Sequence, residues 1–227
     1  MTADDYRAGL AEFLGTLLFV FLGSGAAVAS ISSGTEFPPE RSLIIAMSHG
    51  LAIAAVTSAW ITVSGAYFNP ALTLAAWITG KVSLRRSALF IVLQLAGATA
   101  GCALLTYIVP EATALRLAAP ALGSGLDSTR GLVLEMALTF GLVSVFFMSA
   151  MHPRGTVSLA PIAIGFTVLA GYLVGGPLTG PAMNPARSFG IAVVAGSWAD
   201  HWIYWVGPLL GGMIAAIIAN QIYLKSE

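Results

Sequence analysis

The hydrophobic residues of this chain fall into long runs that short polar stretches separate. Six runs are long enough for a helix that crosses the hydrocarbon layer of a membrane, which takes about 20 residues. They cover residues 8–31, 42–64, 84–109, 128–150, 157–176 and 199–223. The pattern predicts an all-α membrane protein with six transmembrane helices.

Two further apolar segments, 69–79 and 184–195, are too short to cross a membrane. Each begins with the tripeptide Asn-Pro-Ala, and the residues of the two copies are Asn69, Pro70, Ala71 and Asn184, Pro185, Ala186. Asparagine caps helices and proline suits the first helical turn, so each segment is predicted to be a re-entrant half-helix. Backbone that is broken at membrane depth is tolerated where it lines a polar cavity. The two copies therefore predict a pore.

The same order of elements occurs twice along the chain. Residues 1–115 and residues 116–227 each contain two spans, a half-helix and a third span, and segment 64–71 matches segment 179–186. Three crossings is an odd number, so the second repeat is expected to be inverted relative to the first. The half-helices then enter from opposite faces, within one transmembrane channel domain that covers residues 1–227.

Composition excludes several classes of function. Hydrophobic residues make up 57% of the chain and charged residues 9%, against about 25% charged in soluble domains. The expected surroundings are membrane lipids, and a net charge of zero gives no reason to expect nucleic acid as a partner. One cysteine and scattered histidines and acids predict no metal site, no cofactor and no enzyme activity.

Basic residues in the loops indicate the orientation. With a cytoplasmic N-terminus, the inner side holds Arg7, Lys81, Arg85, Arg86, Arg154 and Lys225. The outer side then holds Arg41, Arg116 and Arg130. The excess on the first side predicts that both termini are cytoplasmic. The short tails suit a bacterial inner membrane.

The facing half-helices would act as an electrostatic barrier. Each helix N-terminus carries about half a positive elementary charge and several unpaired N–H donors. Asn69 and Asn184 would offer side-chain N–H donors to the lumen while their oxygens cap the helices. A neutral molecule that accepts hydrogen bonds passes such a site and a cation meets a barrier. Arg187, directly after the second tripeptide, would add a positive charge at the pore mouth.

Glu12 and Glu135 lie early in the first and fourth runs. Unpaired carboxylates are not stable in such surroundings, so both are expected to accept hydrogen bonds from the re-entrant loops or to be protonated. We interpret them as supports of the loop backbone. A proton relay is the alternative.

The paired tripeptides, the segment 180–190 and the six-span layout resemble the aquaporin family, the major intrinsic proteins. The resemblance covers essentially the whole chain. It implies a narrow outer constriction with one residue each from spans two and five and two from the second re-entrant loop. The matching positions are His49, Tyr172, Pro181 and Arg187. The resemblance also implies a homotetramer with one pore in each subunit.

Some positions bear on the solute. Many water-selective members have Phe and His where this chain has His49 and Tyr172, which leaves the solute open. The resemblance to the water-type branch rests on Ser188, Ala192, Tyr204 and Trp205. At Tyr67, where many members have histidine, the chain departs again, and this leaves inner-side regulation or pore width open.

The predicted function is a passive channel that conducts water and excludes protons and ions. The two half-helices and the outer arginine, Arg187, would control which solutes pass through the pore. A channel for another small neutral solute (ammonia, hydrogen peroxide, urea or glycerol) is the alternative. A coupled secondary transporter and a structural role at membrane junctions are less favoured.

Overall fold

The computed structural model describes residues 1–32, 38–109, 116 and 118–223, and the regular structure in these ranges is helical. The helices are α1 (Ala3–Ser32), α2 (Pro38–Trp60), α3 (Pro70–Ile78), α4 (Leu84–Ile108), α6 (Ser128–Phe146), α7 (Ala160–Thr179), α8 (Pro185–Ala195) and α9 (Ile203–Ile218). Helices α6 and α9 continue into the π-helical turns η1 (Phe147–Met151) and η2 (Ala219–Tyr223). The predicted all-α class is confirmed over the described ranges.

Within the described ranges, six helices are long and apolar enough to cross a membrane, namely α1, α2, α4, α6 with η1, α7, and α9 with η2. They coincide with the six predicted spans, while α3 and α8 are the predicted short segments. The ends differ by a few residues. Helix α1 begins at Ala3, before the apolar run, because its polar first turn with Asp4 and Asp5 is helical as well. Helix α7 extends to Thr179 because Pro177 is accommodated in its last turn.

Close helix pairs frame the molecule: α1 packs on α4, α6 on α9, and α2 on α7. Small residues allow this approach. A Cβ atom on Gly101 of α4 would lie 2.6 Å from the carbonyl oxygen of Leu17 on α1. A Cβ atom on Gly211 of α9 would lie even closer to the carbonyl oxygen of Met136 on α6. Helices without large side chains at the crossing can pack backbone to backbone, as is common in membrane bundles.

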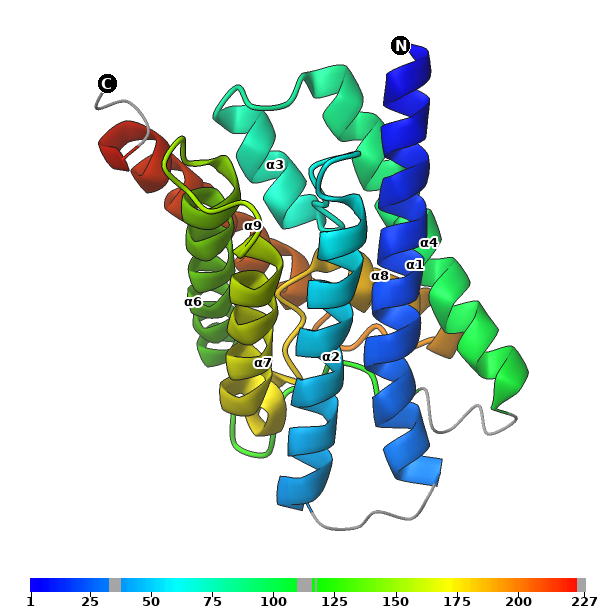
Figure 1. The fold of residues 1–227 in the computed structure, drawn as a ribbon. Helices are drawn as coiled ribbons and strands as arrows, with labels where there is room; N and C mark the ends of the chain where they lie inside the picture. The colour runs from blue at the N-terminus through cyan, green and yellow to red at the C-terminus, as the bar shows by residue number, and fades with distance from the viewer. Residues whose placement is uncertain (33–37, 110–115, 117, 224–227) are drawn as a thin grey trace.

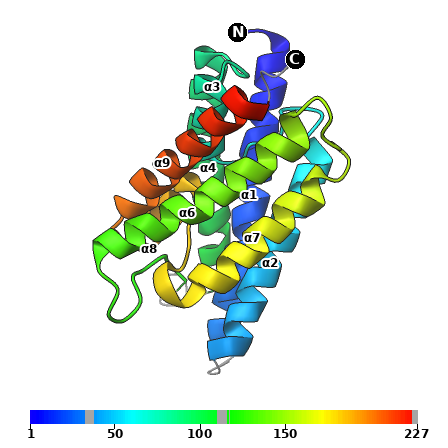
Figure 2. The ribbon, with the colours of Figure 1, turned by 90° about the vertical axis from the view of Figure 1, so that its left-hand side faces the viewer.

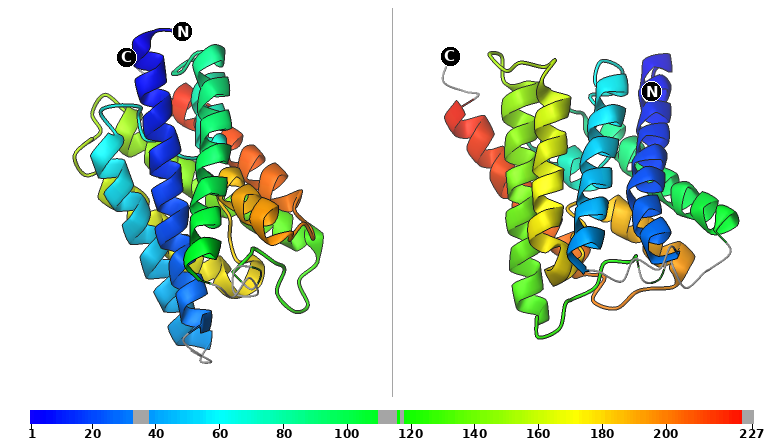
Figure 3. Two further views of the ribbon diagram at one scale, coloured as in Figure 1. Left: turned by 90° about the vertical axis from the view of Figure 1, so that its right-hand side faces the viewer. Right: turned by 60° about the horizontal axis from the view of Figure 1, so that its bottom comes forward.

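The two short helices pack mainly against spans from the other half of the chain. Helix α3 lies against α9 and, to a smaller extent, against α4, whereas α8 lies against α4. Figures 1 and 3 show α3 and α8 within the bundle, with their N-terminal ends near its middle. Each half of the chain thus surrounds the short helix of the other half.

The N-terminal end of α1 and the C-terminal end of η2 lie on the same side of the bundle (Figures 1 and 2). The turn between α3 and α4 and the loop between η1 and α7 lie on that side too. The basic residues that were assigned to the cytoplasmic side fall in these segments and in the first turns of α1 and α4, except Lys225, which is outside the described residues. Residue 115, the end of the predicted first repeat, is also outside them.

Candidate transport pore

The two Asn-Pro-Ala tripeptides form the same local structure. Asn69 is in extended conformation, and its Oδ1 accepts the backbone N–H of Ala71 at 2.8 Å. Asn184 does the same with the N–H of Ala186 at 3.0 Å. The proline that follows each asparagine takes the first helical position, where no N–H is needed. The sequence therefore starts a helix at each tripeptide by side-chain capping.

The two tripeptides also bind each other. The Nδ2 of Asn69 donates to the carbonyl oxygen of Met183, and the Nδ2 of Asn184 donates to that of Phe68, both at 2.8 Å. A side-chain amide nitrogen has two N–H donors, so one donor remains on each asparagine. Both asparagines line a cavity in the middle of the bundle. The half-helices are thus joined N-terminus to N-terminus, with donors available to a solute.

The residue before each asparagine has an unusual backbone. Phe68 and Met183 both have φ near 50° in the left-handed region, which costs free energy for a residue with a side chain. The N–H of Phe68 donates to Glu12 at 2.6 Å, and the N–H of Met183 donates to Glu135 at 3.0 Å. In each half, the carboxylate of one glutamate therefore stabilises the strained turn that orients the asparagine.

Glu12 has further partners. Its oxygens accept hydrogen bonds from the hydroxyl of Ser64 at 2.6 Å and from the N–H of Tyr67 at 3.0 Å. Gln94 of α4 donates to it at 2.7 Å and also to the hydroxyl of Thr73 at 2.8 Å. Glu12 is fully buried. Gln94 was not among the residues predicted from the sequence, although a polar amide inside an apolar span was a usable signal.

Glu135 has an equivalent set of donors in the second half. It accepts from the hydroxyl of Thr179 at 2.8 Å and from the N–H of Ala182 at 3.1 Å. Tyr204 of α9 donates its hydroxyl to the carbonyl oxygen of Thr179 at 2.9 Å, which ties this loop to α9. From the sequence, Tyr204 was expected only to mark the resemblance to the water-type branch, and this contact was not predicted.

The structure brings the four expected constriction residues together. The rings of His49 and Tyr172 stack with centroids 4.0 Å apart, and the guanidinium carbon of Arg187 lies 5.7 Å from the centroid of Tyr172. Tyr172, Pro181 and Arg187 line one cavity at the end of the bundle away from the N-terminus, which we call the outer cavity. His49 instead packs behind Tyr172, and a Cβ on Gly23 of α1 would lie 2.6 Å from its Cδ2. Three of the four expected residues, Tyr172, Pro181 and Arg187, therefore line this cavity, and the fourth, His49, supports the Tyr172 ring by stacking on it.

Several buried polar atoms at this constriction are available to bind water. Tyr172 Oη, His49 Nε2 and Arg187 Nε are buried and have no protein hydrogen-bond partner within the described ranges. The other ring nitrogen of His49 pairs with the carbonyl oxygen of Ile45 at 2.9 Å. Buried polar atoms are usually paired with protein or ordered water. The unpaired atoms suit a passage that holds water.

Three cavities follow one another along the bundle. The volume open to the centre of a water molecule is about 350 Å³ in the outer cavity, about 20 Å³ in the middle one and about 290 Å³ in an inner one. Tyr172 lines both the outer and the middle cavities, and Tyr67 lines both the middle and the inner cavities. One water centre needs about 10–15 Å³. The middle section therefore has room for one or two water molecules, which suits passage of water in single file.

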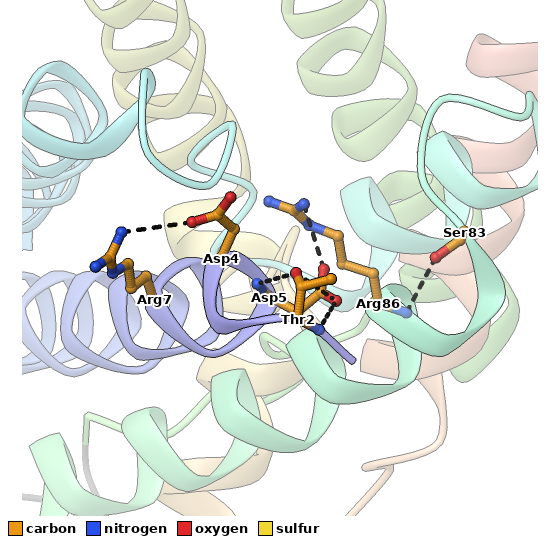
Figure 4. A network of polar contacts seen from close by, with 6 residues as sticks. All are labelled: Thr2, Asp4, Asp5, Arg7, Ser83 and Arg86. Atoms are coloured by element: carbon orange, nitrogen blue, oxygen red, sulfur yellow. Dashed lines mark hydrogen bonds and ion pairs between the residues drawn. The ribbon is translucent and has the colours of Figure 1, made fainter.

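The inner mouth is bordered by charged residues that connect α1 to α4. Asp5 and Arg86 approach to 3.5 Å, and Ser83 caps α4 by accepting the N–H of Arg86 (Figure 4). Asp5, Arg86 and Lys81 line a further cavity of about 440 Å³ beside Tyr67. This ion pair links the N-terminal end of α1 to the first turn of α4 beside the passage.

Comparisons with known proteins agree with this geometry. The family model described as "Major intrinsic protein" matches residues 1–219. Aquaporin TIP4-4 of Zea mays is 42% identical to this chain over 98% of it and 88% of the relative. Probable aquaporin TIP3-2 of Arabidopsis thaliana is 43% identical over 98% of the chain and 86% of the relative. Both are plant proteins and lend no support to the expected bacterial inner membrane.

A solved structure shares the fold. The X-ray structure of the aquaglyceroporin from Plasmodium falciparum superposes with a TM-score of 0.84 over 96% of each chain, at 20% sequence identity. This likeness concerns the fold, whereas the family follows from the family model and the plant relatives. The chain is an integral, multi-pass membrane protein, and it belongs to the major intrinsic protein family of membrane channels.

Proposed function

We propose that this channel conducts water passively and excludes ions and protons. The observation that carries the proposal is the junction of α3 and α8, where two asparagine amides line a middle cavity with room for water in single file. Most of that lining is apolar, including Ile53, Leu142 and Val168. A water molecule there has hydrogen-bond partners at the asparagines and few elsewhere.

Water is oriented at the junction. Asn69 and Asn184 can each donate one N–H to a water oxygen, which turns the hydrogens of that water away from the half-helices. Neighbouring waters on the two sides are then oriented in opposite directions, so a proton cannot be relayed along the row of water molecules. The positive ends of α3 and α8 point at the same place and oppose a cation that has lost its hydration.

Arg187 provides a second barrier at the outer end. Its side chain is 2% exposed and its NH1 donates to the carbonyl oxygen of Gly180 at 3.4 Å. The linings of the outer and middle cavities include Arg187 and Arg41 but no carboxylate among the described residues. A cation that enters from this side is repelled twice, first by the guanidinium group of Arg187 beside Tyr172 and then by the helix ends.

A second candidate function is conduction of another small neutral solute, such as ammonia, hydrogen peroxide or urea. The unpaired phenol of Tyr172, which the His49 ring holds by stacking, favours it, since this hydroxyl lines the passage and can bind solutes other than water. Glycerol is less favoured because the Tyr172 ring narrows the outer end. A coupled carrier would need carboxylates free to bind ions, whereas Glu12 and Glu135 each accept several hydrogen bonds from the loops.

We also propose that both termini are cytoplasmic and that the chain forms a homotetramer in lipid. Large apolar side chains are exposed on most spans, for example Leu51, Val92 and Phe166. Such surfaces suit either lipid or neighbouring subunits. Cross-linking of the protein in native membranes, followed by denaturing electrophoresis, would give a ladder that ends at four subunits.

The water-channel proposal is tested with purified protein in liposomes. After an osmotic step, loaded vesicles should shrink much faster than empty ones, and permeability equal to that of empty vesicles would refute the proposal. We expect Arg187→Val to keep the water flux and to raise the leak of protons or small cations. The matched control is Arg41→Val, which removes an equal charge from the same outer cavity away from the constriction. An equal leak in both variants would mean that Arg187 is not the barrier.

A further inference from the structure

Tyr67 occupies the inner end of the narrow middle section. Its side chain lines the middle cavity and the two inner cavities that Lys81 also lines. Phe146 likewise lines both the middle cavity and an inner one. Tyr172 has the corresponding position at the outer end. The single-file section is therefore bounded by aromatic side chains at both ends.

The ring of Tyr67 is fixed in place from several sides. Its centroid lies 5.5 Å from that of Phe146 and 6.0 Å from that of Phe90. A Cβ atom on Gly65 would lie 2.8 Å from its Cε2, so the ring rests directly on that glycine. Its own N–H donates to Glu12 at 3.0 Å, and the residue is 6% exposed. A ring that is packed in this way forms a wall of the passage rather than a free side chain.

The chemistry of this wall differs from that of the outer constriction. Phe146 contributes only carbon atoms, and the hydroxyl of Tyr67 has no protein hydrogen-bond partner within the described part of the chain. A solute at this point can therefore bind one hydroxyl group. Water loses few hydrogen bonds here, whereas a polyol has to give up several to pass between two rings.

We propose that Tyr67 and Phe146 form a second, inner constriction that acts in series with the outer one at Tyr172 and Arg187 and limits the size of the solutes that pass. The inference rests on the proposed channel function and extends it, because it assigns specificity to residues on the cytoplasmic side. For two barriers in series, the higher one determines the flux. Widening the outer constriction alone then leaves larger neutral solutes excluded by the inner pair.

The test compares glycerol permeability in liposomes across a series of variants. The outer-widened channel carries Tyr172→Ala and Arg187→Val, and a second channel carries Tyr67→Val in addition. We expect the outer-widened channel to pass little glycerol and the triple variant to pass about tenfold more, which corresponds to a barrier lower by about 1.4 kcal/mol. Tyr67→Val alone should leave glycerol excluded, since the outer constriction is intact. Water flux in the same vesicles checks that each variant is folded.

A matched pair of phenylalanines provides the control. Phe146→Leu in the outer-widened channel should raise glycerol flux, whereas Phe147→Leu should not, because Phe147 is fully buried and is absent from the linings of the cavities described above. Equal glycerol flux in the outer-widened channel and the triple variant would overturn the inner constriction. That result is distinct from failure of the proposed function, which would be seen as lack of water flux in the unaltered protein.

Discussion

Removal of the Glu12 carboxylate should destabilise the first re-entrant loop. In Glu12→Ala the N–H groups of Tyr67 and Phe68 lose acceptors at 3.0 and 2.6 Å, and Gln94 loses one at 2.7 Å. An unsatisfied buried donor costs about 1–3 kcal/mol. Two backbone donors give about 2–6 kcal/mol, and the left-handed φ of Phe68 loses its support as well. For chains of this size, about 4 kcal/mol corresponds to a melting temperature lower by ~8–16 °C.

The chain contains its own reporter for this measurement. Cys102 is its single cysteine and is fully buried. A thiol-reactive fluorescent dye in detergent solution therefore labels the protein only as it unfolds. Heating Glu12→Ala with the dye should give an earlier rise in fluorescence than heating the unaltered protein, and water flux in liposomes should fall.

Two variants make the result specific. Asp4→Ala removes a carboxylate from an exposed ion pair with Arg7 and should leave the melting temperature unchanged. Glu12→Gln keeps one oxygen acceptor but turns an NH₂ group toward N–H donors, so its loss should be smaller than that of Glu12→Ala. If Glu12→Ala melts within about 1 °C of the unaltered protein and conducts water equally well, then the carboxylate does not hold the loop and our reasoning is wrong.

Three further outcomes follow from the structure. Gly211→Ala places a Cβ against a backbone carbonyl of α6 and should lower the melting temperature by several degrees, whereas Gly141→Ala, with open space around its Cβ position, should be neutral or slightly stabilising. Pro181→Cys, in a background without the native cysteine, should make water flux sensitive to mercury, because residue 181 lines the outer cavity; unchanged flux would contradict that placement. At the outer end, burial lowers the pKa of His201, whose Nε2 accepts the indole N–H of Trp205 at 3.0 Å only while unprotonated. The stabilisation from this contact is therefore present above the ordinary histidine pKa of about 6.5 and is lost as the pH falls through the lowered pKa of His201. Tryptophan fluorescence should report this loss in the unaltered protein and not in His201→Phe.

The helices were predictable from the sequence because a membrane leaves few alternatives. Backbone groups in lipid must be paired internally, so a long apolar run has to be a helix, and Asn-Pro-Ala in a short apolar run marks a helix start at membrane depth. The ends of the spans were less predictable, since the first turns of α1 are polar and still helical. Which span each half-helix packs against depends on side-chain fit between distant segments and has no local signal.

The candidate site was predictable in part. The positions of His49, Tyr172, Pro181 and Arg187 came from the resemblance, and the structure places them together, although their roles remain proposals. The packing of His49 behind Tyr172 was not foreseen, because it depends on the space beside Gly23 on another helix.

The backbone of the loops gave no sequence signal at all. Left-handed residues are usually glycine, whereas the chain has Phe68 and Met183 there. The backbone N–H groups of these residues donate to distant glutamates, which stabilises the conformations, and such bonds cannot be inferred from local propensity.

The embedding of each half-helix in the opposite half has a consequence for biosynthesis. A growing chain that has passed α4 already contains Asn69, but the carbonyl oxygen of Met183 that its amide binds is not yet made. Helix α3 likewise lacks α9, its main packing surface, until the last span is synthesised. The N-terminal half therefore cannot complete its interior on its own, and ribosome-bound intermediates should keep the first re-entrant segment open to proteases until α9 has inserted.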